Sequence, residues 1–128
     1  MARAVLTVVA VTVLACGAAT AQTPDASADF PQGAAPLEPA ALRQRLTGKV
    51  FRVVPKSASP WRLQFNDNGY YFVNTESGYS DSGKWRIEAS SLCTEPQKTK
   101  AACNEMRQAA ETLYLKRDSG EIVKFEPR

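Results

Sequence analysis

The pattern of hydrophobic positions changes from helix-like to strand-like near Gly48. Before that point, residues 39–48 begin with a proline and end with a glycine, and Leu42 and Leu46 stand one helical turn apart. Proline suits the first turn of a helix, and glycine suits the position where a helix ends. We therefore predict one short helix that packs its two leucines against the body that follows.

Most of the remaining chain alternates between apolar and polar positions, with the period of two that half-buried strands show. Residues 61–65, for example, place Trp61, Leu63 and Phe65 on one face. The strand-like runs cover residues 49–54, 61–65, 70–73, 84–88, 92–93, 112–116 and 121–125. Residues 103–110 fit either a strand or a helix, because Ala, Glu, Met, Arg and Gln are good helix formers.

Turn signals join these runs into hairpins. Residues 66–69 read Asn-Asp-Asn-Gly and residues 118–120 read Asp-Ser-Gly, and Asn and Gly accept the positive φ of hairpin turns. The spacing lacks the helical crossovers of a parallel sheet. Seven or eight short strands in about 85 residues predict an all-β fold, a small antiparallel meander that forms a closed barrel or an open curled sheet.

The first 21 residues resemble a bacterial signal peptide. Arg3 precedes an apolar run over residues 4–15, which is shorter than the roughly 20 residues that span a bilayer. The sequence therefore predicts a periplasmic or secreted protein.

Two processing sites compete in this segment. The small residues at 19–21 suit ordinary signal peptidase and would leave a soluble chain that starts at Gln22. Residues 13–17 resemble a lipobox, in which Cys16 would be lipidated and anchor the protein in the cell envelope. A membrane is expected as a partner only through that anchor.

Residues 22–41 predict a flexible linker. They hold four of the eight prolines, many alanines and three acidic residues without a basic one, so they cannot bury enough apolar surface to offset chain entropy. The folded domain is expected over residues 42–128, which carry 15 basic and 10 acidic residues.

The cysteines predict one disulfide. Cys16 is removed or acylated in either processing route, which leaves Cys93 and Cys103 to pair in an oxidising compartment. A metal site is not expected, because two cysteines without histidine supply too few soft ligands. We expect no cofactor.

The order of turn glycines, core aromatics and cysteines resembles that of small secreted proteobacterial domains of unknown function. The matching segments are Gly48-Lys49-Val50-Phe51, Trp61-Arg62-Leu63-Gln64-Phe65, Gly69-Tyr70, Ser82-Gly83-Lys84-Trp85-Arg86-Ile87, Leu92-Cys93, Cys103, Leu113-Tyr114-Leu115 and Gly120. The resemblance covers residues 46–126 and implies a barrel similar in general shape to lipocalin-like or avidin-like meanders. Gly48-Lys49-Val50 departs from the Gly-x-Trp of lipocalins, and the resemblance carries no functional residue.

Composition argues against several classes of function. The chain has no histidine, which excludes catalytic triads and His-based metal sites. It also has no Ser-x-x-Lys motif and no glycine-rich phosphate loop, so we expect no catalytic residue and no enzyme. A calcium loop starting at Asp67 fails because its twelfth position is Gly78. A net charge of +3 is too small to indicate nucleic-acid binding.

Two features of the predicted surface suggest binding. Tyr79 and Asp81 lie in the polar loop 76–83, where tyrosine offers rigid contact area, although Tyr79 could instead fold back over the barrel end. A basic set could meet an acidic partner or an anionic envelope lipid, or form ordinary solvated surface. The basic set comprises Lys98 and Lys100 in the disulfide loop, with Arg62, Lys84 and Arg86 on outward strand faces.

Three hypotheses of function follow. The leading one is an exported cell-envelope interaction protein, such as an inhibitor or immunity-type module, whose partner is an envelope protein. The alternatives are a lipocalin-like barrel for a small apolar ligand or lipid, and a structural envelope lipoprotein. In a domain of this size the large aromatics are expected to fill the core rather than line a cavity. These aromatics are Trp61, Phe65, Tyr70, Phe72, Trp85 and Phe125.

Overall fold

The computed structural model describes residues 29–128. The predicted signal peptide, its processing sites and Cys16 lie outside the described residues. The elements are α1 (Pro39–Leu46), β1 (Lys49–Val53), β2 (Trp61–Phe65), β3 (Tyr70–Thr75), β4 (Ser80–Glu88), β5 (Ser91–Pro96), β6 (Ala102–Ala109), β7 (Thr112–Lys116) and β8 (Ile122–Pro127).

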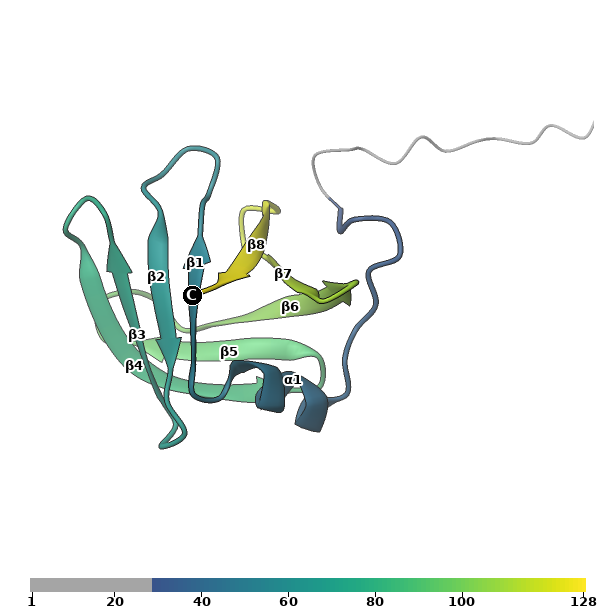
Figure 1. Ribbon diagram of the computed structural model, residues 1–128. Helices are drawn as coiled ribbons and strands as arrows, with labels where there is room; N and C mark the ends of the chain where they lie inside the picture. The colour runs from purple at the N-terminus through teal and green to yellow at the C-terminus, as the bar shows by residue number, and fades with distance from the viewer. Residues whose placement is uncertain (1–28) are drawn as a thin grey trace, which may run out of the picture.

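The eight strands form a closed antiparallel barrel (Figure 1). Each strand pairs with the next one in the chain, and β1 pairs with β8 to close the barrel. This confirms the predicted meander and selects the closed form over the open sheet. Residues 103–109 belong to strand β6 and Ala110 to the turn that follows, because pairing with β5 and β7 overrides their helix propensity.

The two ends of the barrel differ. At one end, which we call the closed end, α1 lies across the barrel and buries Leu42 and Leu46 completely. Arg45 fastens α1 to the barrel by donating to the side chain of Gln108 and the carbonyl of Glu111. The opposite, open end carries the loops over residues 54–60, 76–79, 97–101 and 117–121. The core inside the barrel above α1 includes Phe51, Val53, Trp85, Met106, Leu113 and Val123.

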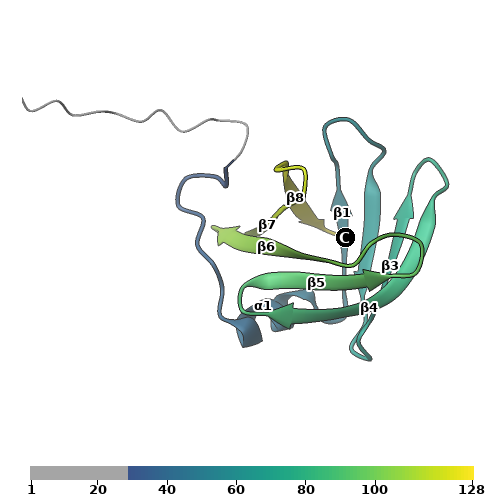
Figure 2. The same cartoon turned by 180° about the vertical axis from the view of Figure 1, so that it is seen from behind.

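The predicted linker differs from its expected form where the structure describes it. Ala35 exchanges two backbone hydrogen bonds with Gln108 of β6, at 3.0 and 2.8 Å, and Phe30 is buried with Arg107 stacked 4.6 Å from its ring centre. Figure 2 shows this segment running past the end of β6. The second half of β6 pairs with β7 on one side, but its pairing with β5 on the other side ends at Glu105, opposite Ser91. The arm supplies a backbone partner on that free side.

The disulfide between Cys93 and Cys103 is confirmed. The two residues face each other directly in the register of β5 and β6, with their Cα atoms 4.0 Å apart. Their neighbours Leu92 and Thr94 face the barrel interior, so the disulfide points away from the cavity, with Cys93 buried and Cys103 exposed.

Gly83 lets β4 bend around the barrel. A Cβ atom there would overlap the backbone of Glu95 and Pro96, so every other residue would push β5 away. A glycine in a strand commonly marks such a close approach. Among the described residues, no helix has the length and apolar character needed to cross a bilayer.

Two of the predicted core aromatics lie on the outer surface. Tyr70 and Phe72 of β3 are 44% and 41% exposed, whereas Tyr71 between them is 5% exposed. The four residues 70–73 are all apolar or aromatic, so the local pattern does not say which alternate positions face inward. Pairing of Tyr71 with Phe65 and Gly83 decides it.

Candidate functional site

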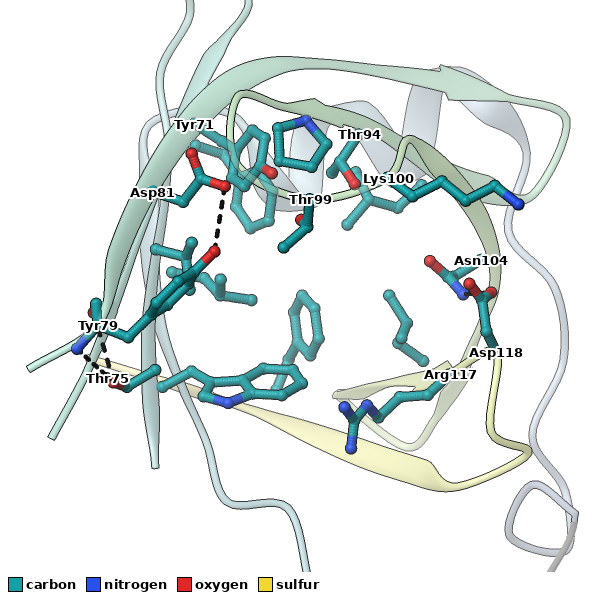
Figure 3. A pocket seen from close by; sticks show the side chains of 18 of the residues that line it. Tyr71, Thr75, Tyr79, Asp81, Thr94, Thr99, Lys100, Asn104, Arg117 and Asp118 are labelled. Atoms are coloured by element: carbon teal, nitrogen blue, oxygen red, sulfur yellow. Dashed lines mark hydrogen bonds between the residues drawn. The ribbon is translucent and has the colours of Figure 1, made fainter. Parts of the chain in front are cut away.

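A cavity of about 460 Å³ occupies the open half of the barrel. Figure 3 looks into it and shows side chains converging from all sides of the barrel wall. Its floor consists of Leu63, Phe65, Tyr71, Val73, Leu92, Leu115 and Phe125. Its rim, at the open end, includes Trp61, Tyr79, Asp81, Lys100, Arg117 and Asp118. Apart from Trp61, the lining residues nearest the open end are polar, charged or small.

The floor is built from aromatic rings in contact. Phe65 stacks on Phe125 with ring centres 6.4 Å apart and on Tyr71 at 6.3 Å. Trp85 supports Phe65 from the closed end, edge to face at 5.3 Å. Such contacts hold the rings in fixed positions, so the floor is an apolar surface that exists before any ligand binds.

Asp81 is the buried charge of the rim. Its Oδ1 accepts from the backbone N–H groups of Ser82 at 2.7 Å and Gln97 at 3.2 Å. Its Oδ2 accepts from the N–H of Lys98 at 3.0 Å and the hydroxyl of Tyr79 at 3.3 Å. Desolvation opposes ionisation, but these donors outweigh it and hold the pKa of Asp81 below its ordinary value. Asp81 therefore shapes the 97–101 loop as an ionised carboxylate.

Tyr79 stands beside Asp81 at the rim, with 42% of its surface exposed. Its N–H donates to Thr75 Oγ1 at 3.0 Å, and the Lys98 ammonium lies 5.5 Å from its ring centre. Desolvation and the Asp81 charge raise the pKa of the Tyr79 hydroxyl. The Tyr79 ring lies at the side of the cavity and forms part of its wall (Figure 3). It does not cover the opening.

Arg117 is held on the other side of the rim. Its guanidinium carbon lies over the Trp61 ring, 4.7 Å from the ring centre, and Nη1 donates to Glu121 Oε1 at 2.7 Å. The second oxygen of Glu121 accepts from the N–H of Lys56 at 2.8 Å. The bonds from Lys56 and Arg117 lower the pKa of Glu121. This cluster ties the 54–60 loop to the 117–121 turn and positions Arg117 at the cavity.

Between these two sides, the rim carries Asn104, Asp118 and Lys100. The Asn104 amide donates to the Lys116 carbonyl at 3.1 Å and to Asp118 Oδ1 at 2.9 Å. The Lys100 side chain extends along the rim (Figure 3). The ammonium of Lys100 has no hydrogen-bond or ion-pair partner within residues 29–128.

The structure gathers three of the predicted binding residues around one cavity: Tyr79, Asp81 and Lys100. Lys98 lies next to them but donates its ammonium to the Ser80 carbonyl. Arg62 lies outside, because its neighbours Trp61 and Leu63 face the interior.

The other members of the basic set do not reach the cavity. Lys84 points outward from β4, and Arg86 pairs with Glu88 at 3.0 Å and Glu95 at 3.6 Å. Sequence reasoning missed Arg117 and Asn104, which become rim residues only when β6 and β7 join the barrel. No local pattern signals them.

One cluster outside the cavity has metal-ligand chemistry. Glu88, Cys93 and Cys103 bring potential ligand atoms within 4.8 Å of one another. The two sulfurs are bonded to each other in the disulfide, whereas metals bind cysteine as the thiolate. The cluster therefore cannot act as a three-ligand site in the oxidised protein.

Comparisons with known proteins leave the site to be interpreted from its geometry. No protein-family model, curated protein or solved structure matches the chain.

Proposed function

We propose that this protein binds a small, largely apolar molecule in the open half of its barrel. The observation that carries the proposal is the cavity of about 460 Å³ with an aromatic floor and a polar rim. Ligand pockets typically measure roughly 300–1,000 Å³ and combine apolar walls with a few polar groups. An eight-stranded barrel that is only half filled by its own side chains is suited to one small ligand.

The rim chemistry supports binding rather than acid–base catalysis. The lowered pKa values of Asp81 and Glu121 keep both carboxylates ionised near neutral pH, which makes them poor proton donors. Both are also engaged by backbone N–H groups. We therefore propose a carrier or sensor of its ligand, without a chemical step.

The place of action is proposed from the sequence together with the disulfide. Structural disulfides persist in oxidising compartments, and Cys93–Cys103 is such a bond. With the signal-like residues 1–21, it supports a periplasmic, secreted or lipid-anchored protein. A lipid on Cys16 would be compatible with ligand binding, because the barrel is complete without that segment.

Native mass spectrometry tests the proposal first. Protein purified from its natural source should carry a small-molecule adduct that organic solvent releases. Val73→Trp should remove the adduct, because the Val73 side chain is on the floor and the indole ring of tryptophan would occupy the cavity. Asn74→Trp is the matched control, since Asn74 is exposed on the opposite face of the same strand. A bare mass for the wild type, or equal adducts for both variants, would contradict the proposal.

A second candidate is the interaction with an envelope protein that the sequence favoured. Tyr70 and Phe72 favour it, because they expose two aromatic rings side by side on the outer face of β3. In this case Phe72→Ser should remove a protein adduct from the native mass spectrum and leave the cavity ligand in place. Retention of the protein adduct would exclude this face.

A further inference from the structure

We infer that the ligand carries an anionic group, such as a carboxylate, at the Lys100 and Arg117 side of the rim, with its apolar body on the floor. This inference rests on the proposed binding function and narrows it to one class of ligand. It follows from a comparison of the charged groups around the cavity: which cations keep unused N–H donors, and which carboxylates keep unused acceptor sites. Four of the residues that line the cavity are charged: Asp81, Asp118, Lys100 and Arg117.

The buried acid of the rim has no acceptor capacity left. A carboxylate offers about four lone-pair sites, and Asp81 already accepts four hydrogen bonds. A cationic ligand would have to displace one of these donors from a group that is 8% exposed. Asp81 therefore acts as part of the scaffold and not as a counter-ion for a ligand.

Arg117, unlike Asp81, has most of its hydrogen-bonding capacity unused. A guanidinium offers five N–H donors, and the structure shows one side-chain hydrogen bond from Arg117, to Glu121. Contact with the Trp61 ring, 4.7 Å from the guanidinium carbon, and the bond to Glu121 restrict the movement of the guanidinium. Arginine in a fixed orientation is well suited to carboxylate oxygens, so Arg117 can receive an anion with little loss of side-chain freedom.

Lys100 adds a second source of donors. Its ammonium has three N–H groups and no partner among residues 29–128. The flexible lysine stem lets the charge move to an anion at the opening. Asp118 is the remaining acceptor. Asp118 and Lys100 are both exposed, so water and salt weaken the attraction of each for a ligand charge. Asp118 already accepts a hydrogen bond from Asn104, whereas the less exposed Arg117 keeps free donors, so the balance favours an anion.

The rim aromatics also disfavour a cationic ligand. Aromatic faces can bind ammonium groups, but each of the two rim rings already has one of the protein's own cations close to it. Arg117 lies on Trp61, and Lys98 lies 5.5 Å from the centre of Tyr79. A ligand ammonium would meet like charge at both positions, whereas a carboxylate would meet attraction.

A head-group series tests the inference. Octanoate, 1-octanol and octylammonium share one apolar chain, and their affinities for the full-length protein can be compared by isothermal titration calorimetry at neutral pH. We expect octanoate to bind about tenfold more tightly than octylammonium, with octanol between them. The preference should shrink as salt is added. Equal affinities, or tighter binding of octylammonium, would overturn the inference.

Variants locate the anion site. Lys100→Gln should weaken octanoate about threefold and leave octanol unchanged. The double variant Arg117→Gln/Glu121→Gln removes a cation without leaving an unpaired carboxylate, and it should have a similar or larger effect. Lys124→Gln is the control, because Lys124 is exposed on the outer face of β8. If both rim variants keep the wild-type preference for octanoate, the assignment to these residues is wrong.

The experiment separates failure of the inference from failure of the proposed function. If none of the three octyl compounds binds, or if Val73→Trp leaves their binding unchanged, cavity binding itself is contradicted. If all three bind and Val73→Trp abolishes binding, the cavity is the site, and the order of affinities alone decides the charge of the ligand.

Discussion

Asp81 shows how one side chain organises the candidate site. Its carboxylate connects β4 to the backbone of the 97–101 loop through Gln97 and Lys98, and it orients Tyr79. An isolated buried carboxylate would be costly, and the four donors are what make its position tolerable. The residue that sequence analysis singled out for binding is thus better explained as the support of the residues that contact a ligand.

Asp81 also predicts a dependence of stability on pH. Because the pKa of Asp81 is lowered in the folded protein, the unfolded chain binds a proton more readily, so acidification below the unfolded pKa removes stability. Near neutral pH that contribution is fully present. We expect Asp81→Asn to lower the melting temperature at pH 7 and to flatten its fall between pH 5 and about pH 2, followed by circular dichroism. A parallel fall in both proteins would contradict this role.

In β3, Tyr71 faces the barrel interior and Tyr70 faces outward. We therefore expect replacement of the two tyrosines to lower the unfolding free energy by unequal amounts. Tyr71 is 5% exposed and packs on Phe65, whereas Tyr70 is 44% exposed. Tyr71→Ala should cost about 3–5 kcal/mol of unfolding free energy, as removal of a large buried aromatic does. Tyr70→Ala should cost less than about 1 kcal/mol. Urea denaturation measures both, and similar losses would mean that the strand phase is wrong.

At the scale of elements, local signals predict the hairpins but not their closure. The turn at Asn66 to Gly69 and the alternation of β2 are visible in the sequence, and both occur in the structure. Closure depends on β1 and β8, which share two register pairs and carry no local sign of each other. The rim has the same limitation, because Trp61 and Arg117 meet only after β1 and β8 have paired.

The β5–β6 pair predicts a measurable role for the disulfide. Only four register pairs join these strands, and Cys93–Cys103 is one of them. A disulfide that closes a short loop contributes about 2–3 kcal/mol in the chain-entropy account, so Cys93→Ser/Cys103→Ser should lose about that much in urea denaturation. Reductant should lower the stability of the wild type and leave the double variant unchanged. Indifference of the wild type to reductant would contradict the contribution.

At the scale of the whole molecule, α1 covers one end of the barrel, and the cavity lies at the other end. At the closed end, Leu42 and Leu46 of α1 join the hydrophobic core of the barrel. The open half leaves the cavity lined by residues from strands on both sides of the β1–β8 junction, such as Leu63 of β2 and Phe125 of β8. A molecule in the cavity would therefore contact both sides of the least extensively paired junction of the barrel.

This arrangement predicts that a ligand stabilises the fold and protects the β1–β8 junction. Binding to the folded state alone adds about 2.7 kcal/mol when free ligand is at 100 times its Kd, so octanoate should raise the melting temperature of the wild type. Hydrogen exchange should slow at the amide of Arg128, which donates to the Val50 carbonyl across that junction. Val73→Trp should lose both effects, and Asn74→Trp should keep them. A higher melting temperature without slower exchange at this amide would mean that the ligand stabilises the barrel without strengthening its closure.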